Sequence, residues 1–173
     1  MRLNAALRAA FALAAGIIIT FSQQHGSETG LLALLIASVG WSLAAAVASV
    51  TLKDRVQKIV YVPLVVIHGF MGFLAMQPEA TGQQNFALLV TAWGILLGGY
   101  EILQAQMVGL KTRAGRDHTI TAVLTLLVGG LFLAVPLDVV SAVGFFGAYL
   151  VLVGIHLGLA AFSPTRTDPA AKK

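Results

Sequence analysis

The sequence predicts an all-α integral membrane protein with six transmembrane helices. Three observations favour this fold class. First, 58% of the 173 residues are hydrophobic and only 10% are charged, whereas soluble domains carry about 25% charged residues. Second, six mostly apolar segments approach the roughly 20 residues that a helix needs to cross a bilayer. Third, lysine and arginine are confined to alternate loops, as expected for a chain threaded through a membrane.

The six segments are predicted to be helices because they mix Leu, Val, Ile, Ala and Gly without the two-residue alternation of strands. They cover residues 6–22, 30–51, 59–76, 85–107, 119–137 and 139–162. The first follows a short basic stretch and resembles a signal peptide. No small-residue cleavage site follows it, so we interpret it as a retained first helix. One six-helix domain, residues 1–163, and a disordered cytoplasmic tail, residues 164–173, are expected.

The loops predict the orientation in the membrane. All eleven lysines and arginines lie at the N-terminus, in the 52–58 loop, in the 110–117 loop or in the tail. By the positive-inside rule, both termini should face the cytoplasm, as in a multi-pass protein of the bacterial cytoplasmic membrane. The formal charge of +4 therefore indicates loop placement and not nucleic-acid binding. The same loops could also contact anionic lipid head groups, although setting the orientation is the simpler interpretation.

An internal repeat is predicted from three helical hairpins, at about 6–51, 59–107 and 119–162. Each hairpin has a glycine in both helices, at nearly equal separations: Gly16 and Gly40, Gly69 and Gly94, Gly130 and Gly154. The second glycine begins a small-residue pair at i and i+4, namely Gly40 with Ala44, Gly94 with Gly98, and Gly154 with Gly158. Such pairs let helices pack closely in membranes. Because all three hairpins have one orientation, they are parallel repeats and not inverted ones.

The hairpins carry a resemblance to a known family. Proline follows the first helix of two hairpins, at Pro78 and Pro136, and "AWGILLGGYEILQA" precedes a basic loop. With the paired glycines, these features resemble the HdeD-like family of small bacterial membrane proteins, over nearly the whole chain. The resemblance implies a six-helix protein associated with acid or envelope stress in some bacteria. It supplies no catalytic residues.

Three ionisable residues inside the predicted spans form a candidate intramembrane polar site: His68, Glu101 and His156. Such residues are rare in membranes, because burying them is unfavourable by at least a few kcal/mol. Glu101 lies about 22 Å along its helix, near the cytoplasmic end, whereas His68 lies near the midplane. Each could be a satisfied structural group, or together they could line a proton or ligand path.

Partners for these residues can be proposed from the loops. Glu101 could pair with Lys58, Arg113 or Arg116, or accept a hydrogen bond from a nearby tyrosine. His25 and His118 lie in or beside loops and are expected to be solvated. No metal site, haem or other cofactor is expected, because zinc needs three or four ligands and the histidines lack the symmetry of haem ligands.

Trp41 and Trp93 fall near mid-span beside the repeat glycines. We expect them to pack into the space that those glycines leave. No catalytic triad, metalloprotease or nucleophile-elbow pattern occurs, and the chain has no cysteine.

Three classes of function remain. The preferred one is a non-enzymatic HdeD-like membrane protein that is embedded in the lipid bilayer and associates with copies of itself or with other membrane proteins, as a partner or accessory subunit. The alternative is a small transporter or channel with an intramembrane His/Glu polar path. An intramembrane enzyme is the least supported, because no reactive group has an activating partner.

Overall fold

The computed structural model describes residues 2–52 and 55–163. These residues form six long α-helices and one 3-10 turn, with no strand among them. The elements are α1 (Arg2–Phe21), α2 (Ser27–Thr51), α3 (Arg55–Ala75), η1 (Pro78–Ala80), α4 (Gln83–Val108), α5 (Arg113–Ala134) and α6 (Val139–Phe162). The predicted disordered tail, 164–173, lies outside the described residues.

Each of the six α-helices is long and apolar enough to cross a membrane, so the prediction of six such helices is confirmed. Five of them begin earlier than predicted, and the difference is four residues or more for α1 at Arg2, α3 at Arg55 and α5 at Arg113. The prediction followed the apolar runs. Helical backbone hydrogen bonds need no apolar side chain, so these helices begin in the polar residues that precede each run.

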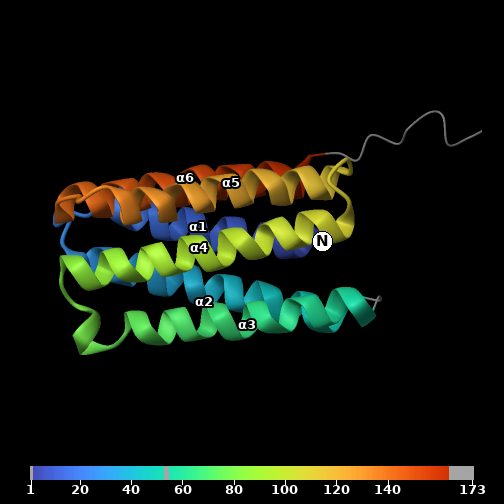
Figure 1. The fold of residues 1–173 in the computed structure, drawn as a ribbon, viewed down its shortest axis with the longest axis horizontal. Helices are drawn as coiled ribbons and strands as arrows, with labels where there is room; N and C mark the ends of the chain where they lie inside the picture. Colours follow the sequence, from blue (N-terminus) through green and yellow to red (C-terminus); the bar gives the residue numbers. More distant parts are fainter. Residues whose placement is uncertain (1, 53–54, 164–173) are drawn as a thin grey trace, which may run out of the picture.

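The six helices run side by side along the long axis of the molecule (Figure 1). Helices α1, α3 and α5 begin, and α2, α4 and α6 end, at one end, which we call the basic end. Every lysine and arginine of the described residues lies there or within about two helical turns of it: Arg2, Arg8, Arg55, Lys58, Lys111, Arg113 and Arg116. The loops of the opposite end carry Glu79 and Asp138 and no cation. Charge is thus separated along the bundle axis.

Two of the helix starts are fixed by side-chain caps. The Thr112 hydroxyl accepts a hydrogen bond of 3.0 Å from the Gly115 backbone N–H at the start of α5. A Cβ on Gly115 would lie 2.1 Å from the carbonyl oxygen of Gly109, so glycine is required in this tight connection. At the start of α6, the Asp138 carboxylate accepts backbone hydrogen bonds of 3.0 Å from Val140 and Ser141. Both caps satisfy N–H groups that a helix start leaves unpaired.

The most extensive helix contacts are those of α4 with α5, α1 with α6, and α2 with α3. The consecutive helices α3 and α4 touch far less. The closest packing therefore falls between the three predicted hairpins and not within them. The parallel repeat stays a prediction of the sequence.

The outer surface of the bundle is apolar on every helix. Each of the six helices has at least one large apolar residue whose relative exposed area is 45% or more. One example from each helix, in chain order, is Ile17, Leu43, Phe70, Leu96, Leu127 and Leu159. A soluble bundle would turn such residues inward. This surface is the one expected of helices whose outer solvent is lipid.

Candidate functional site

A buried ionic network lies about two helical turns inside the basic end. Arg8 of α1 donates a hydrogen bond from Nη2 to Oε1 of Glu101 on α4. The other carboxylate oxygen, Oε2, lies 2.6 Å from Nδ1 of His118 on α5. Arg8 and Glu101 are only 5% and 3% exposed. The Arg8–Glu101–His118 network therefore joins three helices around an ion pair that is removed from solvent.

The sequence places Arg8 on the inward face of α1. Asn4, Arg8, Ala12 and Ala15 recur at intervals of three or four residues and are all buried, so they form one stripe. The small alanines allow α1 to lie close to its neighbours. Our sequence interpretation counted Arg8 only as a topology signal, although its spacing from Ala12 and Ala15 could have revealed the inward position.

Trp41 of α2 holds Arg8 from a second side. The Arg8 guanidinium carbon lies 4.3 Å from the centre of the indole ring, within the range of a cation–π interaction. The indole Nε1–H also donates a 3.0 Å hydrogen bond to the Arg8 carbonyl oxygen. Trp41 thus separates the ionic network from the middle of the bundle.

The three residues of the predicted polar site have three different sets of neighbours. Glu101 binds Arg8 and His118, and not the loop cations or the tyrosines proposed from the sequence. His68 lies between two indole rings, 5.4 Å from Trp41 and 5.9 Å from Trp93 between ring centres. Its Nδ1 is buried without a hydrogen-bond partner.

The third residue, His156 of α6, has its Nε2 3.1 Å from the Asp117 carbonyl oxygen. It therefore ties α6 to α5 one residue away from His118. His118 was expected to be solvated, but its ring is half-buried and contacts Glu101. Its position near the start of a helix made it look like a loop residue.

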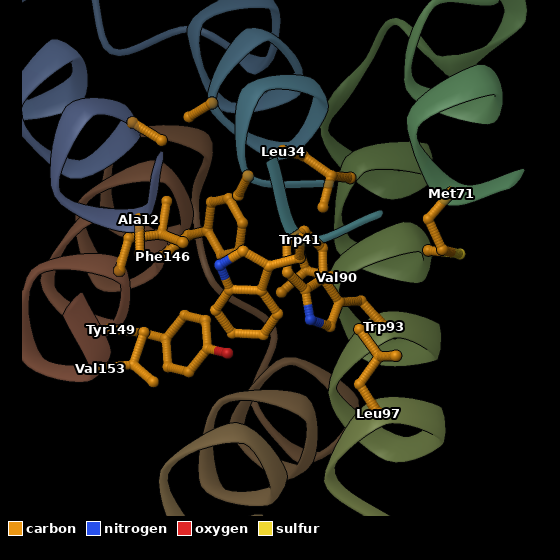
Figure 2. Close-up of a cluster of buried hydrophobic side chains, with 14 of the residues drawn as sticks. Ala12, Leu34, Trp41, Met71, Val90, Trp93, Leu97, Phe146, Tyr149 and Val153 are labelled. Atoms are coloured by element: carbon orange, nitrogen blue, oxygen red, sulfur yellow. The ribbon is translucent and has the colours of Figure 1, made fainter. Parts of the chain in front are cut away.

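Aromatic rings fill the bundle from this network toward the opposite end. Trp41 meets Trp93 edge to face at 5.6 Å, and Trp93 meets Phe146 at 5.8 Å. Phe146 then meets Phe86 at 5.8 Å, which meets Phe132 at 5.9 Å. Figure 2 shows Trp41, Trp93 and Phe146 converging from three helices on the same interior space. We call these five rings the aromatic stack.

Close backbone contact between α4 and α5 brings Glu101 and His118 together. A Cβ on Gly94 would lie 2.5 Å from the Cα of Gly129, and one on Gly129 would lie 2.9 Å from the Cα of Gly94. Only glycine at both positions allows this approach. Seven residues after Gly94 on α4, Glu101 then reaches across to the neighbouring helix.

The other predicted packing positions also lie against neighbouring helices. A Cβ on Gly40 would meet Phe11, one on Gly98 would meet Leu126, and one on Gly154 would meet Leu13, all within 2.7 Å. Ala44 is fully buried, and a Cβ on Gly158 would lie 3.9 Å from that of Ala9. We had expected the tryptophans to occupy the space beside Gly40 and Gly94, but they do not. Phe11 and the backbone of α5 take those places.

Within residues 2–52 and 55–163, no three His, Asp or Glu side chains come together in an arrangement that could hold a metal ion. Both oxygens of Glu101 already contact nitrogen atoms. This carboxylate is therefore placed to neutralise Arg8 and to fix three helices. Comparison of the chain with protein-family models, with curated proteins and with solved structures gave no match.

Proposed function

We propose that this chain is a non-enzymatic integral protein of the bacterial cytoplasmic membrane that acts by associating with other membrane proteins. Its six helices cross the bilayer, and the basic end and both termini face the cytoplasm. The resemblance to HdeD-like proteins adds a role in envelope or acid stress. Within that family, the chain would be a partner or accessory subunit.

The observation that carries the proposal is the ring-filled interior of the bundle beyond the basic end. The Arg8 charge is neutralised by Glu101, and the aromatic stack fills the space beyond it with rings that are almost fully buried. A conduit would need a continuous line of polar groups along the axis, and an enzyme would need a reactive group beside a base. An interior that rings fill beyond the basic end, together with an apolar exterior, supports a function carried out at the surface.

The same observation disfavours the alternative of a transporter or channel. A path along His68, Glu101 and His156 would have to pass the indole rings of Trp41 and Trp93, which enclose His68. No specific contact joins the three residues into one polar line. We therefore do not carry transport forward as a second function.

The test is purification of the tagged, full-length chain from its native membrane in a mild detergent, followed by identification of companions. We expect one or more membrane proteins at a constant ratio to the bait. A matched control is an unrelated six-helix membrane protein with the same tag and expression level. A chain that purifies without companions, and that carries protons or solutes across vesicles, would contradict the proposal.

A further inference from the structure

A cavity of about 300 Å³ opens at the basic end, beside the ionic network. It lies between α1, α5 and α6, with Tyr61 of α3 on its remaining side. Its volume is at the lower end of the range for small-molecule sites. Nothing in the proposed association function uses this cavity, so its chemistry can be considered separately.

Cations outnumber anions among the charged residues of the cavity lining. Arg2 and Arg8 of α1 and Arg113 of α5 all contribute, against the single carboxylate of Asp117. Glu101 is not part of the lining, although it accepts a hydrogen bond from Arg8 Nη2. Arg113 also donates a 3.4 Å hydrogen bond from Nη1 to the Ser163 carbonyl oxygen. Arginine is suited to oxyanions because its planar guanidinium presents several N–H donors at once.

Two helix starts add to this positive potential. The first turns of α1 and α5 both line the cavity, and neither contains an acidic residue. The N-terminus of a helix carries a partial positive charge and unpaired N–H groups. Acidic residues are favoured there, yet this chain places Arg2 and Arg113 at the two positions. The end of α6 contributes a partial negative charge, but two helix starts outweigh it.

Arg8 provides a second, independent indication of a ligand. The Arg8 side chain is only 7% exposed, the residue lines the cavity, and Nε has no hydrogen-bond partner. A buried donor without an acceptor is unfavourable by about 1–3 kcal/mol. An oxyanion in the cavity would place negative charge beside the Arg8 guanidinium while Nη2 stays on Glu101.

The remaining walls are mixed: Ala5, Ala114, Leu157 and Ala160 are apolar, and Asn4, Tyr61, His118 and Thr121 are polar. An anion with an attached organic group suits such a mixed lining better than a bare ion. We propose that the cavity is a binding site for a phosphate group that carries an organic substituent, held by Arg2, Arg8 and Arg113. The group could belong to an anionic phospholipid or to a soluble phosphate ester, and both share this chemistry.

The experiment uses the full-length chain in a neutral detergent and follows its thermal unfolding midpoint. One arm compares sodium phosphate, glycerol 3-phosphate and sodium chloride at equal ionic strength. The other arm compares mixed micelles of phosphatidylglycerol and of phosphatidylcholine at equal lipid fraction. A ligand that binds the folded state raises the midpoint as its concentration increases. A rise with glycerol 3-phosphate supports a soluble source, and a rise with phosphatidylglycerol alone supports a lipid source.

Matched variants separate the cavity from general surface charge. Arg113→Gln and Arg2→Gln each remove a cavity cation, whereas Arg116→Gln removes an exposed cation of the same helix that does not line the cavity. We expect about a tenfold higher half-saturating ligand concentration for each cavity variant, and no change for Arg116→Gln. The use of two cavity variants protects the test if one of them folds poorly.

Two results would overturn this site. One is an unchanged midpoint in both arms for the wild-type chain. The other is an equal weakening by Arg116→Gln and Arg113→Gln, which would show that the anions respond to net surface charge. Either result leaves the proposed association with membrane proteins untouched, because that function is measured by co-purification.

Discussion

The two halves of the bundle interior are built by different chemistry. Near the basic end, helices are joined by the Arg8–Glu101–His118 network. Toward the opposite end, they are joined by the aromatic stack, whose rings meet edge to face. Trp41 belongs to both, because it contacts Arg8 on one side and Trp93 on the other.

The difference shows where a membrane bundle can tolerate buried charge. Arg8 lies six residues after the start of α1, or about 9 Å from the basic end at 1.5 Å per residue. In the proposed membrane orientation, water and lipid head groups are close at that depth, and the unfavourable burial is smaller than at the midplane. Deeper positions carry rings and neutral polar groups, such as His68 and the hydroxyl pair of Thr125 and Tyr149, and no charged side chain among the described residues.

The largest effect is expected from breaking the ionic network. Glu101→Gln leaves the Arg8 charge buried without a carboxylate, so we expect the free energy of unfolding to fall by about 3–5 kcal/mol. The measurement is unfolding of the detergent-solubilised chain by increasing fractions of a denaturing detergent. The double variant Arg8→Gln, Glu101→Gln should lose less than the sum of the two single variants, because they share one interaction. Strict additivity would show that the two side chains are not paired.

The aromatic half should respond to a change in volume and not in charge. Phe146→Ala removes a fully buried ring that contacts Trp93 and Phe86. We expect a loss of about 3 kcal/mol, the lower limit for such substitutions, because a denatured chain in detergent has already left water. Phe145→Ala is the control, since Phe145 is 48% exposed. An equal loss in both variants would mean that the stack does not determine the packing.

Two adjacent glycines allow the α4–α5 contact to be tested with almost identical chemistry. A Cβ on Gly129 would lie 2.9 Å from Gly94 Cα, whereas one on Gly130 meets nothing within 4 Å. Gly129→Ala should therefore destabilise the bundle by about 1–3 kcal/mol through overpacking. Gly130→Ala should be neutral or slightly stabilising, because alanine is the better helix former. If both variants behave alike in the unfolding measurement, the two helices are not in backbone contact.

The smallest effect is expected at the cap of α6. The hydroxyl of Ser141 donates a 2.6 Å hydrogen bond to Asp138, and this bond, with backbone N–H donors, lowers the pKa of the carboxyl. A lowered pKa means that the cap stabilises the fold above the unfolded pKa of about 3.9. That stabilisation is lost as the pH falls through the lowered pKa.

The measurement for the cap is the unfolding midpoint as a function of pH. At neutral pH, Asp138→Ala should unfold slightly below the wild-type chain, and the difference should shrink as the medium is acidified. Asp138→Asn is the control, because asparagine also caps helices but does not titrate. A difference between wild type and Asp138→Ala that stays constant down to strongly acidic pH would rule out the carboxylate cap.

The sequence predicted the six helices well because each apolar run is long and because glycine, proline and charged residues separate the runs. It predicted the location of Glu101 near the basic end, since counting residues along a helix gives depth directly. Local pattern was sufficient for both, and neither depends on which helices are neighbours.

The partners of Glu101 could not be predicted in this way. Arg8 and Glu101 are 93 residues apart in the chain, and only the arrangement of α1, α4 and α5 brings them together. The repeat favoured packing within hairpins, whereas α4 packs most closely with α5. Glycine spacing showed that tight contacts exist but did not identify the helix on the other side.

The orientation of the basic end is the claim on which the rest depends, and single-cysteine labelling tests it most directly. The chain has no cysteine of its own, so Gln23→Cys and Lys111→Cys each introduce one reactive thiol at an exposed position at opposite ends of the bundle. With a membrane-impermeant reagent on intact spheroplasts, we expect Gln23→Cys to be labelled at once and Lys111→Cys only after permeabilisation. Labelling of Lys111→Cys in intact spheroplasts, with Gln23→Cys protected, would contradict the account.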